Sequence, residues 1–302
     1  MFYGWRREHL ARRFNRQISG ILDTRPIQVV DARWVIVSLV FSHDVTMYLL
    51  CIKAFYRRTA GGRVVAIVPA DLPQAQQSLL RRHVEGIELQ VIDEIDTGAS
   101  PRGGPWERLV YCLDRARGSY VIGLDPDVLA FGRDVTEIVS FANGNVPFVM
   151  ADGAEVVCMR EAARRAERDT RAGCIGVAAA RFDRYPGCDE LRYVEGSSGL
   201  TGFARGGKAR QEVEEFHRAM SALMGQGRLE WDAERCASNF AVANSPGAVP
   251  LPYPSYSSFR PGGPRMVAKC LQFAGAHRFE EDFFAGRARE EIRRAMRSSK
   301  PA

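Results

Sequence analysis

The sequence predicts an α/β protein with a mostly parallel central sheet and helices on both faces of that sheet. Two observations lead to this fold class. Apolar runs of strand length alternate with segments of helical length over the first 130 residues, and the links between them are short. With 302 residues and 46% hydrophobic content, the chain can also bury a substantial core.

Four strands and three helices are expected in the first half. The Val- and Ile-rich run at 34–42 reads as a strand buried on both faces. Right-handed crossovers would bring the carboxyl ends of all four strands to one edge, where such folds bind ligands. The predicted strands are 34–42, 64–68, 87–96 and 120–124, and the predicted helices are 45–58, 73–84 and 106–118.

The second half is less regular. Strands are expected within 146–153 and 191–207, and 250–264 reads as a loop rich in proline and aromatic residues. Helical patterns cover 159–172, 208–224 and 229–245, and a basic helix closes the chain.

The net charge of +6 is mostly arginine and is densest near the two ends. Such a charge suits phosphates, nucleic acid or an anionic membrane surface, but no RNA-binding motif or zinc finger is present, and no nucleic acid is expected. The first 20 residues predict a basic helix with an apolar component, which would either pack on the domain or touch a membrane peripherally.

A cytoplasmic protein is expected. No signal peptide and no apolar run long enough to span a membrane is found. The seven cysteines form no Cys-x-x-Cys pair, which favours reduced, buried thiols over disulfides or a zinc site.

The most informative stretch is Asp125-Pro126-Asp127, which interrupts an apolar run at the end of the fourth strand. In extended chain, residues i and i+2 point to the same face, so both carboxylates would aim at one point. Oxygen ligands of this kind suit a hard divalent cation, which could hold a pyrophosphate. The alternative is structural: Asp125 would cap a turn and Asp127 would be solvated. Asp93, Glu94 and Asp96 form a competing acidic group.

This pattern resembles the GT-A glycosyltransferases, in which a nucleotide-binding β/α half ends in a strand with an Asp-x-Asp metal motif. VIGLDPDVLAFG matches that motif, and EGSSGLTGFARG (195–206) is similar to the strand beside the sugar, with Ser197-Ser198-Gly199 where Asn-Ser-Gly is commoner. The late His277 would be a further metal or pyrophosphate contact, the alternative being a surface histidine. The similarity covers roughly 34–282.

The resemblance implies a single domain with four parts. These are a basic N-terminal helical segment (1–30), a nucleotide-binding half (34–132), an acceptor and sugar half (133–282) and a basic C-terminal helix (283–302). It also implies a nucleotide-sugar donor, above all a UDP-sugar, with Mn²⁺ or Mg²⁺ held by Asp125, Asp127 and His277. The acceptor, whether glycan, lipid or protein, stays open.

Further donor contacts follow from the resemblance. Phe41, Ser42 and Asp44, at the end of the first strand, would face base and ribose, with Asp71 next along the edge; alternatively Phe41 is core and Asp44 a helix cap. Arg108 would face the donor phosphates, with Arg102 second, unless it lies on a solvated helix face. Pro126, Ser198 and Gly199 complete the predicted donor site.

Catalysis depends on the stereochemistry of transfer. An inverting enzyme needs a carboxylate base near the acceptor hydroxyl, and Asp152, Glu195, Asp232 and Glu234 are the candidates. A retaining enzyme needs none, because the donor phosphate can take the proton. The aromatic residues of 253–259 would form an acceptor wall or merely an apolar lid.

Two rival interpretations remain. A nucleotidyltransferase would use a related sheet, but it usually carries an early Gly-rich phosphate loop, which FSHDV at 41–45 lacks. A degenerate, non-catalytic GT-A-like binding protein is the other.

Overall fold

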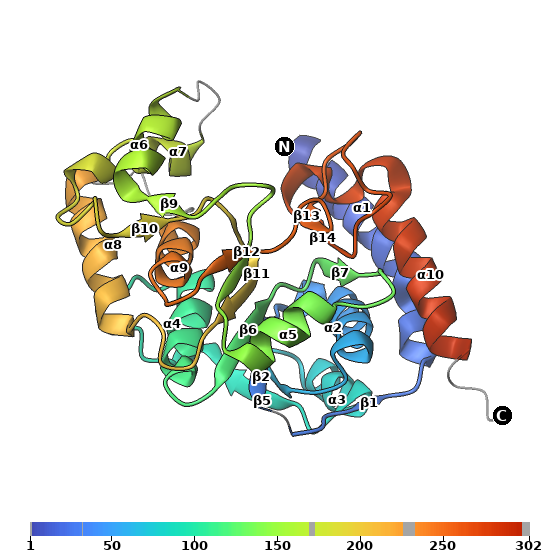
Figure 1. The fold of residues 1–302 in the computed structure, drawn as a ribbon. Coiled ribbons are helices and arrows are strands. Elements are labelled where there is room, and N and C mark those ends of the chain that lie inside the picture. The colour runs from blue at the N-terminus through green and yellow to red at the C-terminus, as the bar shows by residue number, and fades with distance from the viewer. Residues whose placement is uncertain (1, 32, 169–172, 226–232, 298–302) are drawn as a thin grey trace. The chain divides into compact units, whose positions relative to one another are not determined.

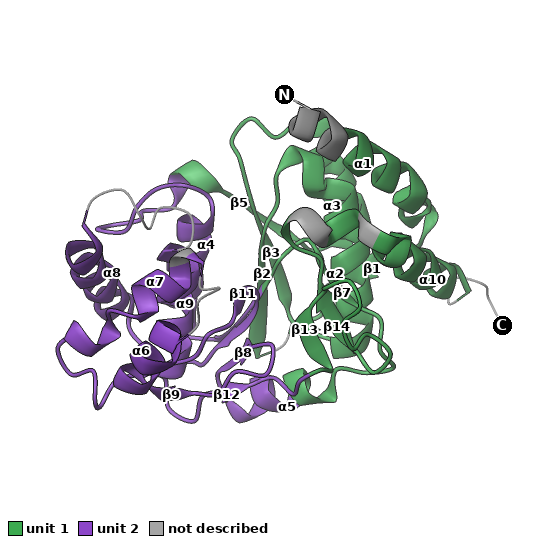
Figure 2. Ribbon diagram, turned by 90° about the horizontal axis from the view of Figure 1, so that it is seen from above, with its two compact units in different colours: residues 1–93, 124–139, 254–302 green, residues 94–123, 140–253 purple. Residues whose placement is uncertain are grey.

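The computed structural model describes residues 2–31, 33–168, 173–225 and 233–297, and the chain divides into two compact units (Figures 1 and 2). Unit 1 comprises 1–93, 124–139 and 254–302, and unit 2 comprises 94–123 and 140–253. Among the described residues, no helix is long and apolar enough to cross a membrane.

Unit 1 is built on the predicted β-α-β pattern. Strands β2, β3 and β5 pair in parallel, with Ile36 opposite Val64 and Ala66 opposite Leu89. β2 is buried along its whole length, as its Val- and Ile-rich sequence predicts. The elements here are β1 (Ile27–Gln28), β2 (Trp34–Leu39), α2 (Val45–Thr59), β3 (Arg63–Val68), α3 (Gln74–His83), β4 (Val84–Glu85) and β5 (Glu88–Val91), with short 3₁₀ turns η1 (Ser19–Asp23), η2 (Ser42–Asp44) and η3 (Ile92–Glu94). The third strand is therefore shorter than the predicted 87–96.

The turn between α2 and β3 depends on a glycine. Ala60 ends α2 in the left-handed conformation, and its N–H donates to Tyr56 O at 2.8 Å. Gly62 follows with φ +110°, and a Cβ there would lie 2.5 Å from the Trp34 indole nitrogen. Any side chain at Gly62 would clash, so the sequence needs glycine there to start β3 beside β2.

A smaller sheet in unit 1 joins segments far apart in sequence. β14 (Cys270–Gln272) pairs parallel with β13 (Tyr256–Ser258) and antiparallel with β7 (Val128–Ala130). The predicted loop 250–264 therefore contains a strand, because its backbone finds ladder partners in β14. This pairing also sets Gln272 opposite Val128, beside the acidic turn.

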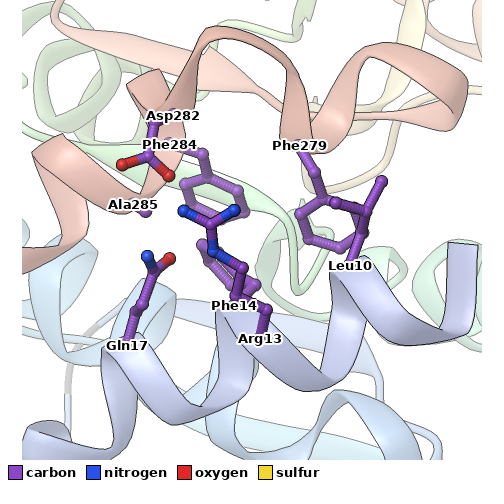
Figure 3. Close-up of a pocket in the computed structure, with 8 residues that line it drawn as sticks. All are labelled: Leu10, Arg13, Phe14, Gln17, Phe279, Asp282, Phe284 and Ala285. Carbon is purple, nitrogen blue, oxygen red and sulfur yellow. The ribbon is translucent and has the colours of Figure 1, made fainter. Parts of the chain in front are cut away.

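The two terminal helices of unit 1 pack on each other. α1 (Phe2–Ile18) lies against α10 (Phe283–Arg297), which follows η5 (Gly275–Asp282). Figure 3 shows Leu10 and Phe14 of α1 facing Phe279 and Phe284. The Phe14 and Phe284 rings are 4.4 Å apart, and Phe14 is buried. The apolar side of α1 is thus used in packing; membrane contact through the basic termini stays a prediction.

Unit 2 holds the elaborated half. Its strands run in the order β12, β8, β11, β6, with β12 parallel and β11 antiparallel to β8. A two-stranded antiparallel ribbon of β9 and β10 accompanies them. The strands are β6 (Tyr120–Leu124), β8 (Phe148–Met150), β9 (Val157–Cys158), β10 (Arg192–Tyr193), β11 (Ser197–Phe203) and β12 (Val249–Pro250), and the helical elements are α4 (Pro105–Ala116), α5 (Thr136–Gly144), α6 (Met159–Arg168), α7 (Cys174–Ala179), η4 (Phe182–Arg184), α8 (Arg210–Met224) and α9 (Ala233–Ala243). β6 and α5 each reach into segments of unit 1.

Candidate functional site

The Asp125-Pro126-Asp127 segment of unit 1 is a turn. The Val128 N–H donates to Asp125 O at 3.1 Å, which closes a four-residue turn with Pro126 at its second position. The prediction of an extended segment is therefore wrong, since the chain reverses locally between β6 and β7. The structural alternative is also wrong in part, because Asp127 is buried, with only 4% of its surface exposed.

The carboxylates of Asp125 and Asp127 nevertheless lie close together, because both contact the side-chain amide of Gln272. Its Nε2 lies 3.0 Å from Asp125 Oδ2 and 3.4 Å from Asp127 Oδ1. Gln272 is the last residue of β14 and is itself buried. It was not predicted from the sequence, since only the β14–β7 pairing brings it here from about 150 residues away.

Arg278 neutralises the buried carboxylate. Its Nη2 lies 2.6 Å from Asp127 Oδ2, and its Nε donates to Phe273 O at 2.8 Å. Burial nevertheless raises the pKa of Asp127. The charge and hydrogen bond of Arg278 and the hydrogen bond of Gln272 oppose this rise. A raised pKa means that the folded protein disfavours the ionised carboxylate, so this position would be stabilised by more positive charge.

Asp44 adds to this negative charge. It is buried at the start of α2, and burial raises its pKa, with the charge of Asp127 contributing further and His43 and Arg278 acting against it. His43 Nε2 lies 3.4 Å from Asp44 Oδ2. Asp44 takes the N-cap position of α2, as the cap interpretation has it, but its side chain makes no capping hydrogen bond.

The neighbouring predicted residues are more exposed. Phe41 is half-buried, with its ring parallel to that of His43 at 6.0 Å, so it is not core. Ser42 is exposed, and its carbonyl accepts from Gln76. Asp71 is also exposed, in a turn after β3. These residues have the exposure that a ligand contact requires, and their roles stay predictions.

A divalent cation is implied by the resemblance, and the residues present fit one. Asp125 and Asp127 offer hard carboxylate oxygens to a common region, and the Gln272 amide carries a further oxygen. Within the described ranges, no group of three or more His, Cys, Asp and Glu side chains is placed to hold a metal. His277 lies in η5, and its side chain is outside the described residues.

Three predicted residues meet in unit 2. Ser198 Oγ donates to Glu234 Oε2 at 3.1 Å, and Arg108 Nη2 lies 3.5 Å from Glu234 Oε1 and 3.2 Å from Ser198 O. Arg108 and Glu234 are each 5% exposed, so the solvated-face interpretation of Arg108 is wrong. Burial raises the pKa of Glu234, against the effects of Arg108 and Ser198.

The strand that carries Ser198 is held on both sides. The Asn239 amide of α9 donates to Gly196 O at 3.0 Å, and the buried Gly199 donates its N–H to Ser197 Oγ. Helices α4 and α9 both contact β11, which explains why Arg108 and Glu234 reach it. No local sequence pattern contains this arrangement, because it joins three separate elements.

The other catalytic candidates are differently placed. Asp152 is exposed in a turn whose central residues, Asp152 and Gly153, both have positive φ (48° and 93°). The Ala154 N–H donates to Ala151 O at 2.8 Å, as in a type I′ turn, for which Asp-Gly is a favoured sequence. Asp232 lies outside the described residues.

The predicted aromatic wall is mostly interior. Tyr256 and Phe259 of unit 1 are 0% and 4% exposed, so neither forms an open surface. Tyr253 of unit 2 is 50% exposed and lies over Gly153. Only Tyr253, of these three, has a ring available to an acceptor.

The sequence matches no protein-family model, and no curated protein matches it significantly. Several solved structures are similar in fold. The galactosyltransferase LgtC, solved with donor and acceptor sugar analogs, superposes with a TM-score of 0.52 at 12% identity, over 86% of this chain and 95% of that one. The bifunctional glycosyltransferase WbbM gives 0.52 at 14% identity, and GlyE of Streptococcus pneumoniae gives 0.51 at 12%.

The extent of these likenesses differs. The match covers 87% of this chain but 50% of WbbM, and 89% of this chain but 64% of GlyE. The chain thus spans half to two thirds of those two proteins and nearly all of LgtC. At 12–14% identity the likeness establishes the fold, which is the GT-A fold: mixed α/β with a mostly parallel central sheet.

Proposed function

We propose that this chain is a glycosyltransferase that transfers a sugar from a nucleotide-diphosphate sugar, in the first place a UDP-sugar, to an acceptor. The observation that carries the proposal is the convergence of Asp125 and Asp127 on Gln272, beside Arg278, in a protein with a GT-A fold. Buried carboxylates with raised pKa values are typical of functional sites.

The divalent cation, Mn²⁺ or Mg²⁺, would be held by Asp125 and Asp127, with His277 as the further predicted ligand. When bound, it supplies positive charge to the diphosphate that departs from the sugar. Arg278 is the chain's own positive group at this position. Its guanidinium pairs with Asp127, and a planar guanidinium is also well suited to phosphate oxygens.

The cluster in unit 2 brings together Glu234 with Arg108 and Ser198, two of the predicted donor contacts. Glu234 accepts from the Ser198 hydroxyl and faces the Arg108 guanidinium, which fixes the orientation of both groups. With its carboxylate engaged twice and 5% exposed, Glu234 is better suited to positioning Ser198 and Arg108 than to removing a proton from an acceptor. This arrangement favours transfer in which the donor phosphate receives the acceptor proton.

A second candidate function also has an observation in its favour. Asp127 is already paired with Arg278 and contacted by Gln272, which is what a metal-free binding protein would need in order to keep a buried carboxylate. Such a protein would bind a nucleotide without transferring a sugar. The two candidates differ in whether a metal strengthens nucleotide binding.

Calorimetric titration of the purified chain with UDP, first with Mn²⁺ and then with EDTA, tests the proposal. We expect binding in Mn²⁺ that weakens at least tenfold in EDTA and is lost in Asp125→Asn/Asp127→Asn. Asp31→Asn serves as the control, because the Asp31 side chain is 88% exposed in unit 1. Equal affinity in Mn²⁺ and EDTA would favour the binding protein, and GDP, CDP and dTDP then test other donors.

A further inference from the structure

Unit 2 contains a cavity of about 170 Å³, and its lining does not include Arg108, Ser198 or Glu234. It lies among β9, β10, α6 and α7, in the segments that link β8 to β11. The space is large enough for several waters or for one compact polar group.

Small side chains create this space. Ala162 and Ala166 face it from α6, and Gly176 and Ala179 face it from α7. Helices α6 and α7 pack against each other, so larger residues at these positions would close the cavity. Ligand sites are concave and combine an apolar lining with a few polar groups, and this space has both.

The charged groups at this cavity are Glu155, Arg165 and Glu195. Arg165 is already engaged: both its terminal nitrogens lie 3.2 Å from Glu155 Oε2, and its Nε lies 3.1 Å from Glu161 Oε1. The lining therefore carries one more negative than positive charge. It would repel a phosphate and would accept hydrogen bonds from hydroxyl groups.

Tyr193 is a buried residue of the cavity lining. It is 2% exposed, and its ring meets that of Phe182 edge-on at 4.6 Å, so the ring is held rigidly and is not itself a contact surface. The alanines and Val157 on the lining suit the C–H faces of a sugar, and the carboxylates suit its hydroxyls. This combination selects a neutral, hydroxyl-rich ring over a nucleotide.

The cavity also adjoins the cluster in unit 2 along the chain. Glu195, on its lining, precedes Ser198 by three residues, which span at most about 10 Å of extended chain. Ser198 is the residue whose hydroxyl donates to Glu234. A sugar bound at Glu195 would thus lie within one or two sugar lengths of that pair.

We propose that this cavity binds a neutral sugar of the acceptor, an assignment that rests on the proposed glycosyltransferase function. Glu155 and Glu195 accept hydrogen bonds from its hydroxyls, while the alanines of α6 and α7 contact its apolar face. The negative lining excludes donor phosphates. The donor and the acceptor are thereby separated by the charge of their binding sites.

The test uses saturation-transfer NMR on the full chain with the methyl glycosides of glucose, galactose, mannose and N-acetylglucosamine. At least one should bind, and Ala166→Leu should weaken that binding at least tenfold by filling the space. Ala222→Leu is the matched control, because Ala222 is exposed on α8. Glu195→Gln, at an exposed position, should weaken binding several-fold and guards against misfolding of the leucine variant.

UDP titration of the same variants separates this inference from the proposed function. Unchanged UDP binding with lost sugar binding in Ala166→Leu supports the cavity assignment. If none of the four glycosides binds, or if Ala166→Leu binds them as the parent chain does, the assignment is overturned even where UDP binds. If sugars bind at the cavity but no nucleotide binds the chain, the glycosyltransferase function falls and the sugar site stands.

Discussion

Two buried carboxylates in unit 1 differ in how many arginines surround them. Glu291 of α10 is fully buried and meets three guanidinium groups, with Arg57, Arg58 and Arg294 all within 3.1 Å. Asp127 is nearly as buried, but Arg278 acts on both it and Asp44. Positive charge is in excess at the first cluster and in deficit at the second.

The difference separates a structural cluster from a candidate site. At Glu291 the arginines also bond to the carbonyls of Ala54, Gly132 and Phe131, which ties α10 to the rest of unit 1. At Asp127 the deficit leaves a preference for further cations, which is what a metal or a basic ligand group would satisfy. Burial and an arginine partner alone would not have distinguished the two.

The largest expected effect is the loss of folding stability on removing the Glu291 carboxylate. Glu291→Ala should lower the free energy of unfolding by about 3–5 kcal/mol, because three arginines lose their buried partner. Urea denaturation measures this, and UDP binding by the folded fraction should persist. The control is Glu290→Gln, whose side chain is 39% exposed and should cost at most about 1 kcal/mol. Equal losses would remove the contrast.

A third buried cluster consists of two basic side chains, Lys53 and His83. Lys53 Nζ lies 2.9 Å from His83 Nδ1, and both side chains are buried. Burial, with the charge of Lys53 second, lowers the pKa of His83 to about 4 from 6.5. Between these values the unfolded chain binds the proton and the folded chain does not, so stability falls as pH drops from 6.5 to 4.

We expect this loss to reach about 3 kcal/mol, since one pKa unit corresponds to about 1.4 kcal/mol. His83→Gln should flatten the dependence in urea titrations between pH 4 and 7, whereas His9→Gln, at an exposed position of α1, should not. Burial likewise lowers the pKa of Lys53 to about 8 from 10.5, so stability should rise between pH 8 and 10.5. A pH profile identical in parent and His83→Gln would refute the assignment.

Arg278 tests the charge deficit directly. Arg278→Gln removes the internal cation from Asp127, so Mn²⁺ should bind about tenfold more tightly, while UDP should bind more weakly. Calorimetry with Mn²⁺ alone and then with UDP measures both. Arg265→Gln is a suitable control, because Arg265 pairs with Glu281 in the same unit. Unchanged Mn²⁺ affinity would mean that Arg278 does not compete for the metal.

The smallest expected effect is at Asp152, an exposed carboxylate that serves as the baseline for the buried ones. Asp152→Gly should change the unfolding free energy by no more than about 0.5 kcal/mol, because glycine tolerates the positive φ of 48° at this turn position. Thermal denaturation measures it. If UDP-sugar turnover is found, a hundredfold loss in this variant would assign Asp152 a catalytic role that its place in the turn does not require.

Local sequence was sufficient for much of unit 1 and for part of the site. The alternation of Val- and Ile-rich runs with helical segments predicted β2, α2, β3 and α3 of unit 1, and α4 of unit 2, within a few residues. The strands were readable because burial on both faces leaves a continuous apolar signal. It also located Asp125 and Asp127 at a strand end. The turn at Pro126 was misjudged as extended chain, since proline is compatible with both.

What only the tertiary structure decided is which charges meet. Gln272 and Arg278 reach Asp127 from about 150 residues away, and Arg108, Ser198 and Glu234 come from two helices and a strand. Glu291, after Glu290, and Asp127, after Asp125-Pro126, each stand beside another acid in the sequence, so the neighbours alone do not show which cations they meet. Their partners depend on long-range strand pairing and helix packing, which no short pattern contains. The sequence therefore determined the fold class and the two acids at the strand end, and the tertiary structure determined the turn between them and the charge balance around it.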